Sequence, residues 1–499
     1  MSSTAIETGT IKTKIPSRLD RLPWARFHWR VLLGLGTAWI LDGLEVTIVG
    51  TVAARMTEHG SGISISVSQI GTAGAIYVVG ACLGALFFGQ LTDRFGRKKL
   101  FLWTLGLYLV ATAATAGSFN FWYFFAARFF TGAGIGGEYA AINSAIDELI
   151  PARARGRVDL IINGSFWVGA MAGSAASIAL LNTAWLPADI GWRLGFVIGV
   201  ILAIAVMLVR RHVPESPRWL FIHGREEEAE AIVAGIERSI QGETGQPLRP
   251  VSKELTVRQR KTIPFREIAR VGFRVYPKRS VLALALFVGQ AFIYNGITFN
   301  LGTMMGTFFK VSSSVVPIFL ILYAAANFAG PLSIGRLFDT VGRRPMISLT
   351  YLGSAVLGVA LAATFAAGVL NSWTFIGFVM ATFFLASAGA SAAYLTASEI
   401  FPMETRALAI AFFYAIGTAA GGVSGPLLFG NLISTGKPGD AALAFYIGSG
   451  VMALGGIAEI AFGVAAERQQ LEDIAKPLTV EEAEQQAGQA AGGAPAQPA

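Results

Sequence analysis

Charged residues are scarce in this chain of 499 residues, and cysteine and histidine are nearly missing. Only 14% of the residues are Asp, Glu, Lys or Arg, whereas about 25% is usual for a soluble domain. The chain therefore has too few charges to cover a water-facing surface. Its single cysteine, Cys82, excludes an internal disulfide framework or a cysteine metal site. All four histidines lie outside the long apolar segments, so we expect no buried histidine metal centre or haem.

Long apolar segments take up most of the chain, since 54% of its residues are hydrophobic. A membrane-spanning helix needs about 20 mostly apolar residues. Twelve segments meet this requirement, six on each side of a polar stretch. They are 31–54, 70–91, 100–118, 121–146, 159–182, 192–210, 281–305, 315–337, 346–369, 373–397, 407–431 and 443–465. The sequence therefore predicts an all-α membrane protein with twelve transmembrane helices.

The apolar segments divide the chain into five predicted parts. They are an N-terminal tail (1–30), a six-helix bundle (31–210), a central segment (211–280), a second six-helix bundle (281–466) and a C-terminal tail (467–499). Residues 224–240 are typical of an amphipathic helix, whose charges we expect to form a solvated face. We expect the C-terminal tail to be largely disordered, because it is rich in Ala, Gly, Gln, Glu and Pro.

Lys and Arg residues are concentrated in alternate connecting segments. If the N-terminus is cytoplasmic, all but five of the 39 basic residues fall in cytoplasmic segments, the exceptions being Arg55, Arg128, Arg193, Lys310 and Lys437. We therefore expect a multi-pass protein of the cell membrane with both termini and the central segment in the cytoplasm. This distribution also accounts for the net charge of +8, so no nucleic-acid partner is expected.

Two loop motifs occur twice in the chain. Residues 89–99 (GQLTDRFGRKK) match residues 335–345 (GRLFDTVGRRP) at five positions. Residues 148–155 (ELIPARAR) match residues 399–406 (EIFPMETR) at three positions, with nearly the same separation. The repetition predicts two related, pseudo-symmetric six-helix halves that enclose a central site near the middle of the bilayer.

These motifs resemble those of the major facilitator superfamily over about residues 25 to 475. Residues 214–220 (PESPRWL), 398–402 (SEIFP) and the Arg128 helix with GAGIGG (132–137) are similar to its sugar porter branch. Residues 42–45 (DGLE) are similar to a pattern of aromatic acid:proton symporters, and to synaptic vesicle protein-like bacterial transporters. The PETKG motif that follows the last helix of sugar porters is missing, and residues 466–474 (AERQQLEDI) stand in its place.

The resemblance implies that the repeated loops stabilise one conformational state and help the protein to switch, in addition to marking topology by their positive charge. The residues concerned are Gly89, Asp93, Arg94, Gly96, Arg97, Glu148, Arg155, Gly335, Asp339, Gly342, Arg343, Glu399 and Arg406.

Ionisable residues inside spanning helices are costly and usually functional. Asp42 and Glu45 are three residues apart, so they share one helix face. Two adjacent carboxylates in a low dielectric resist ionising together, so one of them is expected to keep a proton. In sugar porters an arginine of helix 4 pairs with an acid of helix 1, and the resemblance implies this role for Arg128. We predict that Asp42, Glu45 and Arg128 carry proton coupling; a static ion pair that only fixes packing is the alternative.

Other polar and aromatic residues within the helices are candidate substrate contacts. They are Glu138, Asn163, Trp167, Gln290, Tyr294, Asn295, Asn327 and Tyr394. Each could instead satisfy its hydrogen bonds against a neighbouring helix, whereas as a set lining one cavity they suit a ligand. The glycines of 132–137 are expected to permit close helix packing.

Taken together, the sequence predicts a secondary transporter that takes up a small polar or weakly acidic organic metabolite with protons, by alternating access. No nucleotide-binding loop is present, so we expect the proton gradient to supply the energy without a cofactor. No catalytic residue set is found, so we expect no enzyme. A monomer in the lipid bilayer should suffice. The alternatives are a proton antiporter that exports drugs or metabolites and a membrane sensor that binds a nutrient without moving it.

Overall fold

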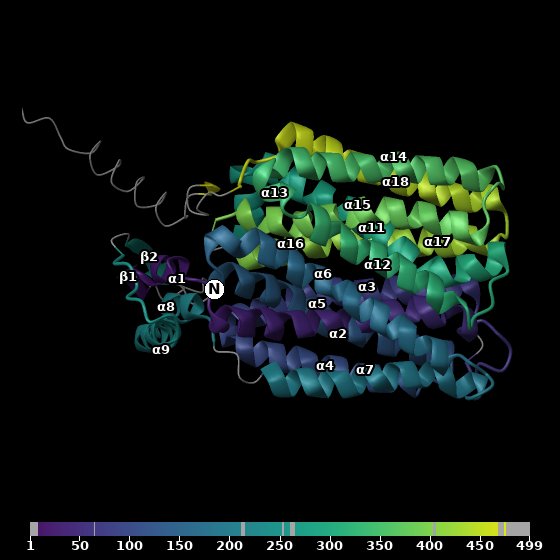
Figure 1. The fold of residues 1–499 in the computed structure, drawn as a ribbon, viewed down its shortest axis with the longest axis horizontal. Coiled ribbons are helices and arrows are strands. Elements are labelled where there is room, and N and C mark those ends of the chain that lie inside the picture. The colour runs from purple at the N-terminus through teal and green to yellow at the C-terminus, as the bar shows by residue number, and fades with distance from the viewer. Residues whose placement is uncertain are drawn as a thin grey trace, which may run out of the picture.

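Long, roughly parallel helices form the body of the molecule (Figure 1). A computed structural model describes residues 8–63, 65–210, 215–251, 254–259, 265–402, 406–467 and 474–475. The first half holds α2 (Arg26–Met56), α3 (Val67–Phe95), α4 (Arg97–Ala116), α5 (Phe121–Leu149), α6 (Ala152–Leu180) and α7 (Ala188–Arg210). The second half holds α11 (Pro277–Phe309), α12 (Val316–Ile334), α13 (Leu337–Thr340), α14 (Arg343–Ala366), α15 (Ser372–Glu399), α16 (Arg406–Thr418), a π-helical turn (Ala419–Val423), α17 (Ser424–Ser434) and α18 (Pro438–Phe462).

Among the described residues, eleven helical segments are long and apolar enough to cross a membrane. Helix α5 is not among them, because Arg128 and Glu138 lower its hydropathy. It is nevertheless 29 residues long and packs between α3 and α4 inside the bundle. We therefore count α5 as the twelfth span, in agreement with the predicted number.

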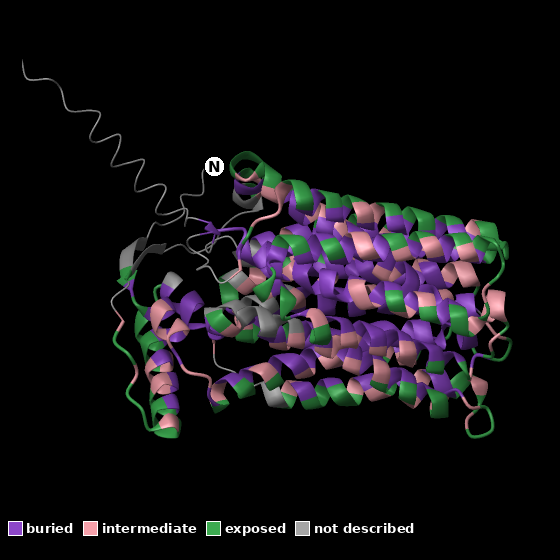
Figure 2. Ribbon diagram, turned by 45° about the horizontal axis from the view of Figure 1, so that its top comes forward, coloured by how far each residue is buried: buried purple, intermediate pink, exposed green. Residues whose placement is uncertain are grey.

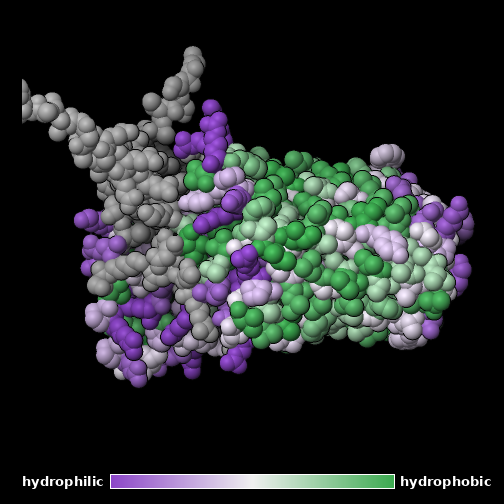
Figure 3. Space-filling model, turned by 90° about the horizontal axis from the view of Figure 1, so that it is seen from above, coloured by the Kyte–Doolittle hydropathy of each residue, from purple (hydrophilic) through white to green (hydrophobic). Residues whose placement is uncertain are grey.

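The surface of the bundle is apolar around its middle and hydrophilic at its two ends (Figure 3). Large hydrophobic side chains such as Trp122, Val110 and Val356 are about two-thirds or more exposed on the outside of the bundle, while the helix faces turned inward are buried (Figure 2). An apolar surface of this extent does not occur on a soluble monomer and indicates contact with lipid. We call the end that carries Arg26, Arg97 and Arg343 the basic end, and the other the opposite end (left and right in Figure 1).

Several helices extend beyond the predicted apolar segments. Helix α2 begins at Arg26 and α6 at Ala152, whereas the apolar runs begin at residues 31 and 159. The second half begins at Pro277, a few residues before the predicted 281. Hydropathy detects only the part of a helix that lies in hydrocarbon, so polar turns at the helix ends are missed.

The most extensive contacts between the halves are made by α2, α3 and α6 of the first half. Helix α3 packs against α16 and α17, α6 packs against α12, and α2 packs against α11. Within the halves, α2 packs on α6, α3 on α5, α11 on α18 and α14 on α18. The halves therefore meet along the axis of the bundle, where a site between them would lie.

A small assembly at the basic end joins the N-terminal segment to the central segment (Figure 1). It holds α1 (Ile15–Asp20), α8 (Pro217–Ile222), α9 (Glu226–Thr244) and a two-stranded antiparallel sheet of β1 (Thr8–Thr13) and β2 (Leu255–Gln259). Helix α10 (Phe265–Arg270) and a π-helical turn (Val271–Val275) lead from it into α11. Ile15 and Leu19 of α1 pack into one buried cluster with Val233 and Ile236 of α9 and with Leu220 of α8.

This assembly adds detail to one prediction and corrects another. The N-terminal segment, predicted as a tail, holds a strand and a helix that pack against the central segment. The acidic face of the amphipathic helix α9 is not wholly solvated: Glu237 accepts hydrogen bonds from Arg18 at 2.7 Å and from Arg21 at 2.5 Å. Glu230 also pairs with Arg18. These partners lie more than 200 residues apart in the chain, so no local pattern reveals them. Most of the tail predicted to be disordered, residues 467–499, lies outside the described residues.

Candidate functional site

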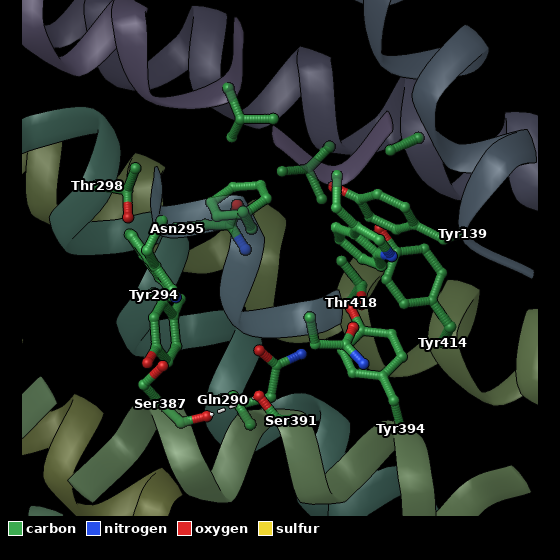
Figure 4. A pocket seen from close by; sticks show the side chains of 18 of the residues that line it. Tyr139, Gln290, Tyr294, Asn295, Thr298, Ser387, Ser391, Tyr394, Tyr414 and Thr418 are labelled. Carbon is green, nitrogen blue, oxygen red and sulfur yellow. Dashed lines mark hydrogen bonds between the residues drawn. The ribbon is translucent and has the colours of Figure 1, made fainter. Parts of the chain in front are cut away.

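A central cavity of about 130 Å³ lies between the two halves (Figure 4). Helices α2, α3, α5 and α6 line it from the first half, and α11, α15 and α16 line it from the second. Its lining residues are Trp39, Val46, Tyr77, Val78, Ala81, Tyr139, Asn163, Phe166, Trp167, Gln290, Tyr294, Asn295, Thr298, Ser387, Ala390, Ser391, Tyr394, Tyr414 and Thr418. None of these side chains is charged. The cavity therefore offers aromatic faces and neutral hydrogen-bonding groups to a ligand.

Six of the eight residues predicted as substrate contacts line this cavity: Asn163, Trp167, Gln290, Tyr294, Asn295 and Tyr394. Asn327 lies directly behind it, where its Oδ1 accepts a hydrogen bond of 2.7 Å from the hydroxyl of Tyr294. Glu138 is buried in α5 next to Tyr139 and is not among the lining residues. The structure thus brings together most of the candidates and places Asn327 as a support for Tyr294.

Aromatic rings from both halves meet on one side of the cavity. Tyr139 stacks on Trp39 with ring centroids 4.7 Å apart, and it meets Tyr414 of the other half edge-on at 5.5 Å. Tyr394 lies 5.9 Å from Tyr414. Figure 4 shows these three tyrosines grouped together, with Tyr294 and Thr298 across the cavity from them. Flat walls of this kind suit a planar ligand.

The sequence did not single out several of these residues, including Trp39, Tyr77, Tyr139 and Tyr414. Aromatic residues are common in all the helices, and the position along the chain does not tell which of them face lipid and which face the cavity. One usable signal was that Tyr139 follows the intramembrane charge Glu138 directly.

Glu45 and Arg128 form a buried ion pair beside the cavity. The Nη1 atom of Arg128 donates a hydrogen bond of 2.5 Å to Oε1 of Glu45, and the two side chains are 1% and 0% exposed. Asp42 is also buried, one turn nearer the basic end on the same helix. The structure thus places the three residues predicted to carry proton coupling close together and gives Arg128 a carboxylate of α2, the first spanning helix, as its partner.

Helix α7 packs closely over this pair. A Cβ atom at Gly199 would lie 3.3 Å from Oε2 of Glu45. Two opposite charges lose much hydration energy when they are buried, and their attraction offsets that loss only while both remain ionised and in contact. If Glu45 became protonated, the hydrogen-bond acceptor of Arg128 would be neutral and would no longer balance its positive charge.

Between the cavity and the opposite end, the backbones of α2 and α11 are in direct contact. A Cβ atom at Gly50 would lie 2.0 Å from the carbonyl oxygen of Thr298, and one at Gly302 would lie 2.4 Å from that of Gly50. Only glycine permits so close an approach. Since Thr298 itself lines the cavity, this contact closes the space between α2 and α11 immediately beyond it.

The repeated loops at the basic end are held by buried charges. In the second half, Nη1 of Arg343 donates to Asp339 at 2.8 Å, while its Nε and Nη2 donate to the two carboxylate oxygens of Glu399 at 3.2 Å each. This forked pairing ties the start of α14 to the end of α15. The side chains of the matching residues Asp93, Glu148, Arg155 and Arg406 lie outside those that the structure describes.

Each repeated loop also has a carboxylate at the start of the helix that follows it. Glu215 accepts hydrogen bonds from the backbone N–H groups of Arg97 at 3.0 Å and Lys98 at 3.2 Å, at the beginning of α4. Glu467 accepts one from the N–H of Arg343 at 3.4 Å, at the beginning of α14. An anion at a helix N-terminus is favourable, because the first N–H groups have no partner within the helix.

The remaining loop residues are glycines and one arginine. Gly96 and Gly342 precede these two helices with φ angles of 93° and 122°, which favour glycine. Gly89 lies within α3, and Gly335 links α12 to α13. The guanidinium of Arg94 lies 5.2 Å from the ring centroid of Phe95.

Residues 28–477 match the family described as sugar (and other) transporter. The chain belongs to this family. Sugar (and other) transporters are major facilitator superfamily proteins, so the chain is a multi-pass membrane transporter and not an enzyme. Its lipid-facing surface and a small-molecule substrate follow from that membership.

Among its relatives, this sugar transporter family member is 30% identical to the niacin transporter NiaP of Acinetobacter baylyi, over 84% of this chain and 90% of the other. It is 26% identical to myo-inositol transporter 2 of Schizosaccharomyces pombe, over 78% of this chain and 71% of the other. The solved structure of the proton:xylose symporter XylE from E. coli matches with a TM-score of 0.71 at 20% identity, covering 90% of this chain and 98% of that one. This likeness confirms the twelve-helix fold.

Proposed function

We propose that this transporter takes up a small, planar, weakly acidic organic metabolite together with protons. The observation that carries the proposal is the buried Glu45–Arg128 pair beside a central cavity of aromatic and neutral polar groups. Glu45 can form an ion pair with Arg128 only while it is ionised. Binding of a proton to this buried carboxylate can therefore change the adjacent cavity. The name of the structural relative, a proton:xylose symporter, agrees with this coupling.

The size and lining of the cavity support a ligand with a single ring. An apolar cavity of about 150 Å³ holds benzene, and the central cavity of about 130 Å³ is of similar size. Trp39, Tyr139 and Trp167 supply ring faces, while Asn163, Gln290 and Asn295 supply amide donors. Niacin, which the relative NiaP transports by its name, is a flat aromatic acid that fits this description.

Sidedness and assembly belong to the same proposal. The distribution of Lys and Arg supports a cytoplasmic position for the basic end, and hence for both termini. The contact of α2 with α11 would then lie on the extracellular side of the cavity. The cavity is formed within one chain, which supports a functional monomer, and the proton gradient would be the energy source without a cofactor.

Transport by the purified protein in liposomes tests the proposal. Radiolabelled nicotinate, myo-inositol and xylose are offered outside, with the lumen more alkaline than the medium. We expect nicotinate to accumulate and a proton ionophore to abolish the accumulation. Glu45→Gln should lose accumulation but keep counterflow exchange, while Glu459→Gln, which alters a buried glutamate of α18 outside the cavity, should keep both.

Other outcomes would contradict the proposal in distinct ways. Protons flow into the alkaline liposome lumen. Movement of substrate out of the lumen, against this proton flow, would identify an antiporter. Binding without counterflow exchange would identify a sensor. Full proton-driven accumulation by Glu45→Gln would show that the ion pair is only structural.

A further inference from the structure

Tyr77 lies between Arg128 and the central cavity. Its side chain is 4% exposed and lines the cavity, while the guanidinium carbon of Arg128 lies 4.7 Å from the centroid of its ring. The position of the residue is fixed by close helix packing, because a Cβ atom at Gly132 of α5 would lie 2.0 Å from the carbonyl oxygen of Tyr77. A change at the ion pair therefore reaches the cavity wall through a single ring.

The hydroxyl group of Tyr77 is buried and has no hydrogen-bond partner among the residues that the structure describes. By contrast, the hydroxyl of Tyr294 donates to Asn327, and that of Tyr323 is bonded to Thr298 at 3.0 Å. A buried hydroxyl without a partner is unfavourable. An acceptor atom of a ligand in the cavity would satisfy it.

Four charged groups act electrostatically on the Tyr77 phenol: Arg128, Asp42, Glu45 and Glu138. While Glu45 is ionised, it balances the positive charge of Arg128. Once Glu45 takes up a proton, it no longer neutralises the positive charge of Arg128, which lies over the face of the Tyr77 ring. A cation over an aromatic face attracts its electrons, which makes the O–H group a stronger donor to an anion.

We propose that Tyr77 donates a hydrogen bond to the anionic group of the substrate and that its ring relays the protonation state of Glu45 to that bond. The inference rests on the proposed function, because it presupposes a substrate with an acidic group and a proton on Glu45. It assigns recognition of the anion to a neutral residue in a cavity whose lining residues carry no charge. Substrate and proton would then favour each other's binding.

Two variants separate the hydroxyl from the ring. Binding of radiolabelled nicotinate, and of its uncharged amide, is measured on the full-length purified protein over a range of pH. Tyr77→Phe should weaken nicotinate binding about tenfold or more, as expected for a lost hydrogen bond to a charged group. It should weaken binding of the amide less than binding of nicotinate. In the wild type, nicotinate binding should be stronger at acidic than at neutral pH. Tyr77→Leu should also flatten the pH dependence of nicotinate binding.

Tyr108→Phe is the matched control, because Tyr108 is a buried tyrosine near Glu45 that is not among the cavity-lining residues. It should bind nicotinate like the wild type. Unchanged nicotinate affinity in Tyr77→Phe would overturn the role of the hydroxyl, and an unchanged pH dependence in Tyr77→Leu would overturn that of the ring. Proton-driven uptake by the wild type, measured in parallel, shows whether the proposed function itself holds.

Discussion

Glu45 and Arg128 lie where neither can be hydrated, so each depends on the other. Removing one partner of a buried pair leaves an uncompensated charge, whereas replacing both with neutral groups of similar size often costs little. The pair can therefore be important for coupling without being important for stability. The two roles can be separated by experiment.

We expect Arg128→Met to lower the free energy of unfolding by about 3–5 kcal/mol, because it leaves Glu45 buried without its partner. The double variant Glu45→Gln/Arg128→Met should recover most of this loss while remaining unable to accumulate substrate. Thermal unfolding in detergent provides the measurement. A double variant no more stable than Arg128→Met would mean that the pair stabilises the fold by itself.

Individual site residues could be predicted from the sequence where their residue type is rare among its neighbours. A charge in an apolar helix stands out, so Asp42, Glu45 and Arg128 could be found and their proximity predicted. Tyr139 and Tyr414 could not be found in the same way, since a tyrosine is compatible with lipid interface, core and cavity alike. Their selection depends on how each helix is rotated about its axis, which only packing determines.

Helix packing in this protein relies on glycines at crossing points. Gly132 and Gly136 of α5 lie against the backbone of α3, as expected from the glycine-rich segment 132–137. A Cβ atom at Gly136 would lie 1.9 Å from the carbonyl oxygen of Ala81. Because Ala81 also lines the cavity, this crossing holds part of the cavity wall in place.

Gly136→Ala should therefore force α3 and α5 apart and destabilise the protein by about 1–3 kcal/mol, the usual range for overpacking. Gly106→Ala is a suitable control, since Gly106 lies within α4 and no atom is within 4 Å of its added methyl group. That control should be neutral or slightly stabilising. Equal melting temperatures for Gly136→Ala and the wild type would contradict the close packing of α3 on α5.

The contact between α1 and α9 should depend on pH through Glu237. Partial burial favours a higher pKa for Glu237, but hydrogen bonds from Arg18 and Arg21 outweigh it and lower the pKa below the ordinary 4.5. The folded state therefore binds a proton less readily than the unfolded segment does. The stabilisation that ionised Glu237 gives to the contact between α1 and α9 is complete above the ordinary pKa. It is lost as the pH falls through the lower pKa of the folded state.

Hydrogen exchange of residues 15–20 should accordingly increase at acidic pH below that range and be slow at neutral pH. Glu237→Gln should exchange faster at neutral pH and show little further change on acidification. Glu228→Gln on the same helix, whose described partner is Arg225, serves for comparison. Slow exchange in Glu237→Gln at neutral pH would show that the apolar cluster alone holds α1.

For the molecule as a whole, the contact between α2 and α11 closes the space between these two helices on the side of the cavity nearer the opposite end. The halves are joined there by backbone, at Gly50 and Gly302, with no side chain between them. The duplication and the number of helices could be predicted from the sequence, because repeated motifs and hydropathy are properties of the linear order of residues. The state of closure could not, since it depends on the relative orientation of two packed bodies.

Gly302→Leu should push α2 and α11 apart and favour opening at the opposite end. A cysteine placed at the cavity residue Thr298, in a Cys82→Ser background, reports the change. We expect an impermeant maleimide to label this cysteine several-fold faster in intact cells when Gly302→Leu is present. Gly450→Leu, at a glycine of α18 with open space around it, should leave the rate unchanged; an equal increase there would point to general loosening.

The carboxylates at the starts of α4 and α14 indicate how long the duplicated unit was. Glu215 and Glu467 are 252 residues apart, close to the separation of the two loop repeats, and they perform the same contact in each half. The ancestral unit that was copied therefore reached past its sixth helix and included this acid. In the first half the chain continues from this acid into α8 and α9 of the central segment. The residues around the two carboxylates differ, whereas the carboxylate that accepts a hydrogen bond from the first N–H group of α4 or α14 is present in both halves.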